Sequence, residues 1–184
     1  ILLLILSGCS VWDNFTTYFN LYFNTATLYE NAEEEILSQK RDLFSIEPLV
    51  VPGTAKTALV KVVEKSSKLL QFYSSSSYVD EALMMLGKSF YYQNNFQKSN
   101  RKFEELLATN IDDDETMTEA NLWIAKNAFE LRDFTEALRV IKEVRIKAVE
   151  EGYEDIIKDS YVQEIKYRIK EQDYPDAITL ANEF

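Results

Sequence analysis

The strongest constraint on the fold is a five-residue pattern that occurs three times in the second half of the chain. Each copy has a polar turn residue, an aromatic residue, two intervening positions and a small residue. The aromatic residues lie 38 and then 40 residues apart, at Phe96, Phe134 and Tyr174. A regular period of this kind is typical of proteins that stack small structural units. The sequence therefore predicts an array of similar units.

Composition restricts the secondary structure of these units to helix. The 184 residues include only 4 Gly and 3 Pro, and the chain is rich in Leu, Ala, Glu and Lys. A chain with so few turn-forming residues is expected to be mostly helical. We predict an all-α fold, built as an α-solenoid of antiparallel helical hairpins.

Small residues predict where the two helices of each unit cross. Gly87 and Ser99 take the two small positions of the first unit, and Ala125 and Ala137 take those of the second. Only Ala177 keeps the pattern in the third unit. Small side chains let two antiparallel helices approach closely while larger side chains fill the flanks.

The stretch from residue 80 to 111 resembles a tetratricopeptide repeat. Leu83, Leu86, Gly87 and Phe90 match the first helix of that motif, and Phe96 matches its turn aromatic. The resemblance implies three repeats at about 77–115, 116–153 and 154–184, with the last one truncated. Hydroxyl side chains that begin capping-box spacings predict the starts of their first helices, at Ser77, Thr116 and Ser160.

A further helical hairpin is expected upstream, over residues 15–76. Apolar residues keep helical spacing from Phe15 to Leu37, and Thr54 is expected to cap a second helix that runs through Phe72. The join at residues 71–83 is similar to the segment between repeats in outer-membrane assembly lipoproteins of the BamD type. This resemblance covers nearly all of residues 15–184, and it implies a role in assembling β-barrel proteins at the outer membrane.

The first nine residues resemble the end of a bacterial lipoprotein signal. An apolar run leads into Leu6-Ser7-Gly8-Cys9, and Cys9 is the only cysteine of the chain. The resemblance implies that residues 1–8 are a signal-peptide remnant, that Cys9 is lipidated and that residues 9–14 form a linker. Ser10 after the cysteine favours an outer-membrane, periplasm-facing location. The alternative is a buried helix end with Cys9 as an inert core thiol.

Charge and composition exclude several classes of function. The net charge of −11 repels nucleic acid, so no nucleic-acid partner is expected. Without any His and with a single Cys, the common catalytic bases and zinc sites are missing. We predict no enzyme, no metal, no cofactor and no small-molecule substrate. The acidic run at residues 112–115 is expected to favour a helix N-terminus rather than calcium.

The repeat register predicts a groove for a partner protein. Lys88, Lys126 and Lys166 occupy the same position in successive units and are expected to form a ladder of lysines that holds an acidic or carboxylate-ended peptide. The simpler alternative is three ordinary exposed lysines. The full set expected to line the groove is Met84, Lys88, Tyr91, Tyr92, Leu122, Lys126, Phe129 and Lys166.

The function expected from these features is a membrane-anchored periplasmic scaffold that binds other proteins, in outer-membrane protein assembly. The long aromatic-rich helix before the repeats also looks like tetratricopeptide lipoproteins of gliding and type IX secretion machines. A glycan-binding import lipoprotein is an alternative of another class, but it would need a large aromatic-bearing insertion. An enzyme that works through carboxylates is the weakest candidate.

Overall fold

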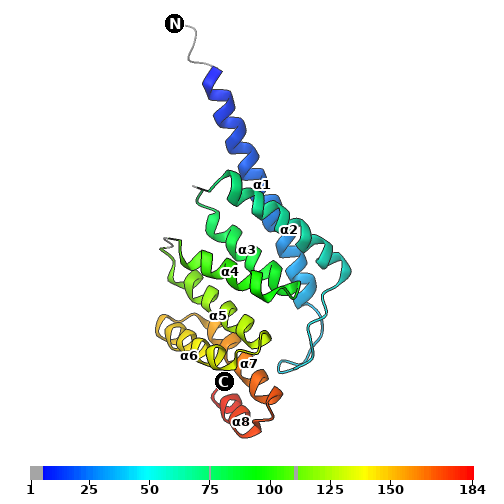
Figure 1. Ribbon diagram of the computed structural model, residues 1–184, viewed down its shortest axis with the longest axis vertical. Coiled ribbons are helices and arrows are strands. Elements are labelled where there is room, and N and C mark those ends of the chain that lie inside the picture. The colour runs from blue at the N-terminus through cyan, green and yellow to red at the C-terminus, as the bar shows by residue number, and fades with distance from the viewer. Residues whose placement is uncertain (1–5, 75, 110–111) are drawn as a thin grey trace.

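The computed structural model describes residues 6–74, 76–109 and 112–184, with side chains from residue 18 onward. Within these residues all regular structure is α-helical, as Figure 1 shows. The helices, in chain order, are α1 (Leu6–Leu37), α2 (Gly53–Phe72), α3 (Val79–Tyr92), α4 (Phe96–Leu107), α5 (Asp114–Glu130), α6 (Phe134–Glu151), α7 (Glu154–Lys170) and α8 (Tyr174–Glu183).

The helices are stacked in the order of the chain. Each helix packs mainly against the one before and the one after it, and the first helices of successive pairs also touch, α3 against α5 and α5 against α7. Figure 1 shows the pairs following one another from α1 and α2 at one end to α8 at the other. In a solenoid each structural repeat contacts only the repeats next to it in the chain, as the helix pairs do here. The expected all-α, solenoid-like fold is therefore confirmed.

The first helix differs from the expectation. It begins at Leu6 rather than near Phe15, so it includes residues 9–14, for which the sequence predicted a linker. Residues 1–5 of the expected signal-peptide remnant lie outside the described residues. Figure 1 shows the N-terminal part of α1 extending away from the stack. Further along, the Tyr22 ring stacks on the Tyr78 ring, with 4.0 Å between their centroids, and fixes α1 to the start of α3.

The recurring sequence pattern corresponds to a recurring turn. The residue two places before each aromatic has a positive φ, which is 58° at Asn94, 64° at Arg132 and 62° at Gln172. The next residue donates its backbone N–H to the carbonyl five positions earlier, at 2.8–2.9 Å in all three turns. This bond closes the first helix of the unit. The side chains of Asn95 and Asp133 then cap the second helix in the first two units.

The hydroxyl caps predicted from the sequence are wrong. Thr54 and Thr116 lie inside the first turns of α2 and α5, Ser160 lies in the middle of α7, and α3 begins after Tyr78 without a side-chain cap. The cap of α5 is Asp113, which accepts hydrogen bonds from two backbone N–H groups. A carboxylate is a stronger acceptor than a hydroxyl, and it also favours the positive end of the helix.

The small residues lie at tight contacts between helices. All five are buried: Gly87, Ser99, Ala125, Ala137 and Ala177. A Cβ placed on Gly87 would lie 2.5 Å from Cζ of Phe103, so this glycine makes room for the Phe103 ring of α4. Ser99 Oγ accepts a hydrogen bond from Asn127 Nδ2 at 2.9 Å, which joins α4 to the next unit.

Replacing Gly87 with Ala is expected to lower the free energy of unfolding by about 1–3 kcal/mol, because the fully buried Phe103 ring has no room to move away. Gly53→Ala is the matched control, since an added Cβ there meets nothing within 4 Å. Chemical denaturation of both variants measures the difference. Equal stabilities would contradict the close contact assigned to Gly87.

Candidate functional site

A cavity of about 710 Å³ lies between α3, α5, α7 and the loop that joins α1 to α2. We call this cavity the groove. The three lysines that the sequence predicted for it reach it from three successive units. The predicted residues that line it are Lys88, Tyr91, Tyr92, Lys126, Phe129 and Lys166.

Met84 and Leu122, which were also predicted for the groove, do not line it. Met84 is buried in the core that α1, α2 and α3 share, and Leu122 packs against α6 and α7. The face of α5 that borders the groove contains Glu119, Trp123 and Lys126, spaced by three and four residues. Leu122 lies three residues after Glu119 and four before Lys126, on the same side of α5, but its side chain is buried in the core that α5 shares with α6 and α7.

Trp123 also lines the groove, although it was not predicted from the sequence. Its ring stacks on Phe103 with 6.0 Å between centroids, and the Tyr91 ring meets it edge-on at 5.1 Å. Trp123 Nε1 donates to Glu119 Oε1 at 3.2 Å. The spacing of Glu119, Trp123 and Lys126 along one helix face is the signal that would have identified it.

Lys126 is almost enclosed beside this tryptophan. Its Nζ lies 3.6 Å from the centroid of the Trp123 ring and 2.9 Å from Asp159 Oδ2 on α7. Burial opposes ionisation of Asp159, but the charge of Lys126 and hydrogen bonds from Gln163 and Lys126 outweigh it and lower the pKa of this carboxyl group. Lys126 is thus held by an aromatic face and a carboxylate of its own protein.

Lys88 is held in the same way. Its Nζ lies 2.7 Å from Glu119 Oε1 and 5.5 Å from the centroid of the Trp123 ring. In both pairs the lysine belongs to one unit and the carboxylate to the next, and we call them the inter-repeat ion pairs. Lys88 and Lys126 are therefore not free to hold an acidic peptide. Glu119 and Asp159 were not predicted for the groove, although they precede Lys126 and Lys166 by seven residues and so lie on the same helix faces.

Lys166 completes the predicted series but has no such pair. Among the described residues, no carboxylate oxygen lies within 4.0 Å of its Nζ. Burial lowers the pKa of Lys166, and Arg41 and Lys126 lower it further, against the opposing effect of Asp159. The positive charges of Arg41 and Lys126 thus lie close enough to Lys166 to oppose its ionisation.

The α1–α2 loop, residues 38–52, forms the opposite wall of the groove. Gln39 Nε2 donates to Ile36 O at 2.9 Å and to Val50 O at 2.8 Å, and it ties the two ends of the loop together. Arg41 donates to the backbone carbonyl of Glu47 within the loop. No periodic pattern marks this loop, so its position opposite helices far along the chain could not be predicted from the sequence.

A half-buried carboxylate and two tyrosines close the α1 end of the groove. Glu33 accepts hydrogen bonds from the hydroxyls of Tyr29 and Tyr92, the latter at 2.9 Å. Burial and the nearby Glu33 charge raise the pKa of both tyrosines well above the usual value. Both phenols are therefore protonated at neutral pH and donate to Glu33.

The described residues contain no group of three or more His, Cys, Asp or Glu side chains arranged to hold a metal ion. A smaller hollow of about 350 Å³ between the N-terminal parts of α5 and α7 is lined by acidic side chains, among them Asp113, Glu115 and Asp155. None of the helices in the described part of the chain combines the length and apolar character that a bilayer span requires.

Comparison with known proteins gave no match to a family model, to a curated protein or to a solved structure. The similarity to outer-membrane assembly lipoproteins therefore remains an expectation from the sequence.

Asp159→Asn is expected to lower the free energy of unfolding at neutral pH by about 1–3 kcal/mol, because Lys126 loses its charged hydrogen-bond partner. The pKa of Asp159 is lower in the folded protein than its ordinary value of 3.8. Its stabilising effect is therefore present above that value and is lost as the pH falls through the lower folded-state pKa.

Urea denaturation of wild type and Asp159→Asn across this pH range measures the effect, and the stability gap should narrow below about pH 4. Glu151→Gln is the control, since its ion pair with Lys147 is exposed to solvent and contributes little to stability. A gap that stays constant down to acid pH would contradict the stabilising role of the ionised Asp159.

Proposed function

We propose that this protein is a membrane-tethered scaffold whose groove binds an extended segment of another protein. The observation that carries the proposal is the groove itself, a cavity of about 710 Å³ to which three successive units and the α1–α2 loop contribute side chains. Solenoids commonly use such surfaces, built from several repeats, for recognition.

The side chains of the groove indicate how a partner segment would be held. Tyr91 and Phe129 line it from α3 and α5, and the Phe129 ring stacks on Tyr167 of α7 at 5.0 Å. Because the inter-repeat ion pairs neutralise two of the three lysines, aromatic and apolar contacts would supply most of the binding free energy. Lys166 would add a charged contact at one end.

The proposed tether is a lipidated Cys9, in keeping with the resemblance of the first residues to a lipoprotein signal. The helical backbone from residue 9 to residue 18 would span about 14 Å, at about 1.5 Å per residue. This part of α1 leads away from the stack in Figure 1. It would hold the groove at a distance from the membrane surface, on the periplasmic side of the outer membrane.

We propose outer-membrane protein assembly as the process, on the basis of the BamD-type resemblance. The length of α1, 32 residues, favours a second candidate, a subunit of a gliding or type IX secretion machine. The two candidates differ in their partners. Barrel-insertion subunits would support the first, and secretion-ring or motility subunits would support the second.

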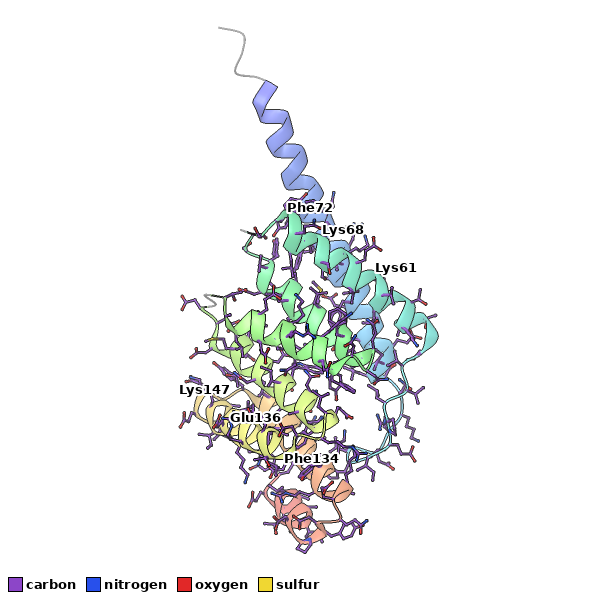
Figure 2. The ribbon with its side chains drawn as sticks, viewed as in Figure 1. Lys61, Lys68, Phe72, Phe134, Glu136 and Lys147 are labelled. Carbon is purple, nitrogen blue, oxygen red and sulfur yellow. The ribbon has the colours of Figure 1, made fainter. Side chains whose placement is uncertain are left out.

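A photo-crosslinking amino acid in place of Phe129 is expected to capture a partner protein in intact cells, because this side chain lines the groove. The same substitution at Phe72 is the control, since this exposed residue at the end of α2 lies outside the groove (Figure 2). Mass spectrometry identifies what is captured. Equal capture from both positions would argue against the groove as the binding site.

Cys9→Ser is expected to release the protein from the membrane fraction, because thioether-linked acyl chains would be its anchor. Mass spectrometry of the mature wild-type protein should find Cys9 as the first residue, carrying lipid. Membrane attachment that survives the substitution would contradict the proposed anchor, while leaving the groove proposal open to the crosslinking test.

A further inference from the structure

The outer side of α2 carries a row of lysines that ends in an exposed aromatic residue. Lys61, Lys65 and Lys68 are spaced by four and three residues, and Phe72 follows four residues later. This spacing places all four side chains on one side of the helix, and we call them the basic stripe. Lys61 and Lys68 are exposed, Lys65 is partly exposed, and Phe72 is 66% exposed. Helices α1 and α3 both pack against the rest of α2.

The basic stripe concentrates positive charge in an acidic protein. Helix α2 has four lysines and one glutamate, a net charge of +3, in a chain whose net charge is −11. Lys68 pairs with Glu64 at 2.7 Å, but among the described residues no carboxylate oxygen lies within 4.0 Å of Nζ of Lys61 or Lys65. Exposed charges are screened over about 8 Å at physiological ionic strength. The stripe therefore presents a positive surface although the protein as a whole is negative.

The outer side of α6 shows that stacking does not require such a row. Four buried positions of α6 repeat the spacing of four buried positions of α2, 82 residues further along the chain. In this register the three lysines of the basic stripe correspond to Glu143, Lys147 and Glu150. Lys147 is itself paired with Asp114 and Glu151. The row of lysines is thus a feature of α2 that the packing of the stack does not explain.

The basic stripe ends where α1 leaves the stack. Tyr73 directly follows Phe72, and its ring centroid lies 4.8 Å from that of Tyr18 on α1. Figure 1 shows the part of α1 before this contact leading away from the other helices, and Figure 2 shows Lys61, Lys68 and Phe72 one after another along α2 towards it. The aromatic end of the stripe is therefore the end nearest to the proposed lipid anchor at Cys9.

We propose that the basic stripe binds the headgroups of anionic phospholipids, so that α2 lies against the membrane to which Cys9 would tether the protein. The lysines contact the phosphate groups, and the Phe72 ring enters the interface between headgroups and acyl chains. The inference goes beyond the proposed function and takes from it only the nearby membrane. Because a tether makes the second contact intramolecular, even a weak surface contact fixes which side of the stack faces the membrane.

Vesicle sedimentation tests the proposal with the full chain carrying Cys9→Ser, so that the outcome does not depend on lipidation. Vesicles of phosphatidylcholine alone are compared with vesicles that also contain phosphatidylglycerol. The combined substitutions Lys61→Gln, Lys65→Gln and Lys68→Gln should lower the ratio of bound to free protein on the anionic vesicles roughly tenfold or more. Phe72→Ala should also weaken this binding. Raising the ionic strength from about 0.1 M to about 1 M should release the protein, because the Debye length falls from about 10 Å to about 3 Å.

The matched control combines Arg139→Gln, Lys142→Gln and Lys147→Gln, which remove the same charge from α6. It should bind anionic vesicles as the Cys9→Ser parent does. Circular dichroism should find the same helix content in both triple variants, since glutamine is a good helix former. Equal loss of binding in the two triple variants, or a parent without preference for anionic vesicles, would overturn the proposal.

A polyglutamate resin separates a lipid surface from an acidic protein as the partner. Retention on this resin without vesicle binding, if abolished by the three substitutions in the basic stripe, would assign the stripe to an acidic protein and overturn the lipid contact. The Cys9 tether is judged separately, by mass spectrometry of the mature wild-type protein. An unlipidated Cys9 together with the expected vesicle binding would refute the tether and leave the basic stripe supported.

Discussion

The structure depends on a single constraint, which is that no helical hairpin of this chain can bury its own apolar face. Phe103 illustrates this, because its ring fills the space left by Gly87 on one side and stacks on Trp123 of the next unit on the other. The next unit in the chain covers the apolar face of the one before it, so the stability of each unit depends on contacts with its neighbours. The same constraint gives the helices their order along the stack.

The groove follows from this stacking. Successive first helices lie side by side, so one face of α3, α5 and α7 becomes a continuous surface. On that surface Lys88 and Lys126 each meet a carboxylate of the following unit and the Trp123 ring, which places buried charge where it is compensated. The charges of Lys88 and Lys126 are therefore balanced within the protein, whereas Lys166 has no carboxylate within ion-pair distance among the described residues.

Much of the fold could be predicted from the sequence because repetition and helical periodicity are local signals. The aromatic spacing located all three turns, and the small residues at Gly87 and Ala137 are buried as expected. The helix starts were less predictable, because a hydroxyl with capping-box spacing competes with better acceptors nearby, as Asp113 does at α5. The repeat register brought three lysines to one cavity, but Met84 and Leu122, which lie on the same helix sides as groove residues, are covered by neighbouring helices instead.

By itself, the sequence determined the helical class, the repeat period and the residues that begin each second helix, since these follow from composition and from contacts a few positions apart. Only the tertiary structure decided that Lys88 and Lys126 are ion-paired, that Trp123 lies between them and that residues 38–52 form a wall of the groove. These features join side chains from different units or from a loop distant in the chain. Their distances depend on how the helices stack, which no local pattern encodes.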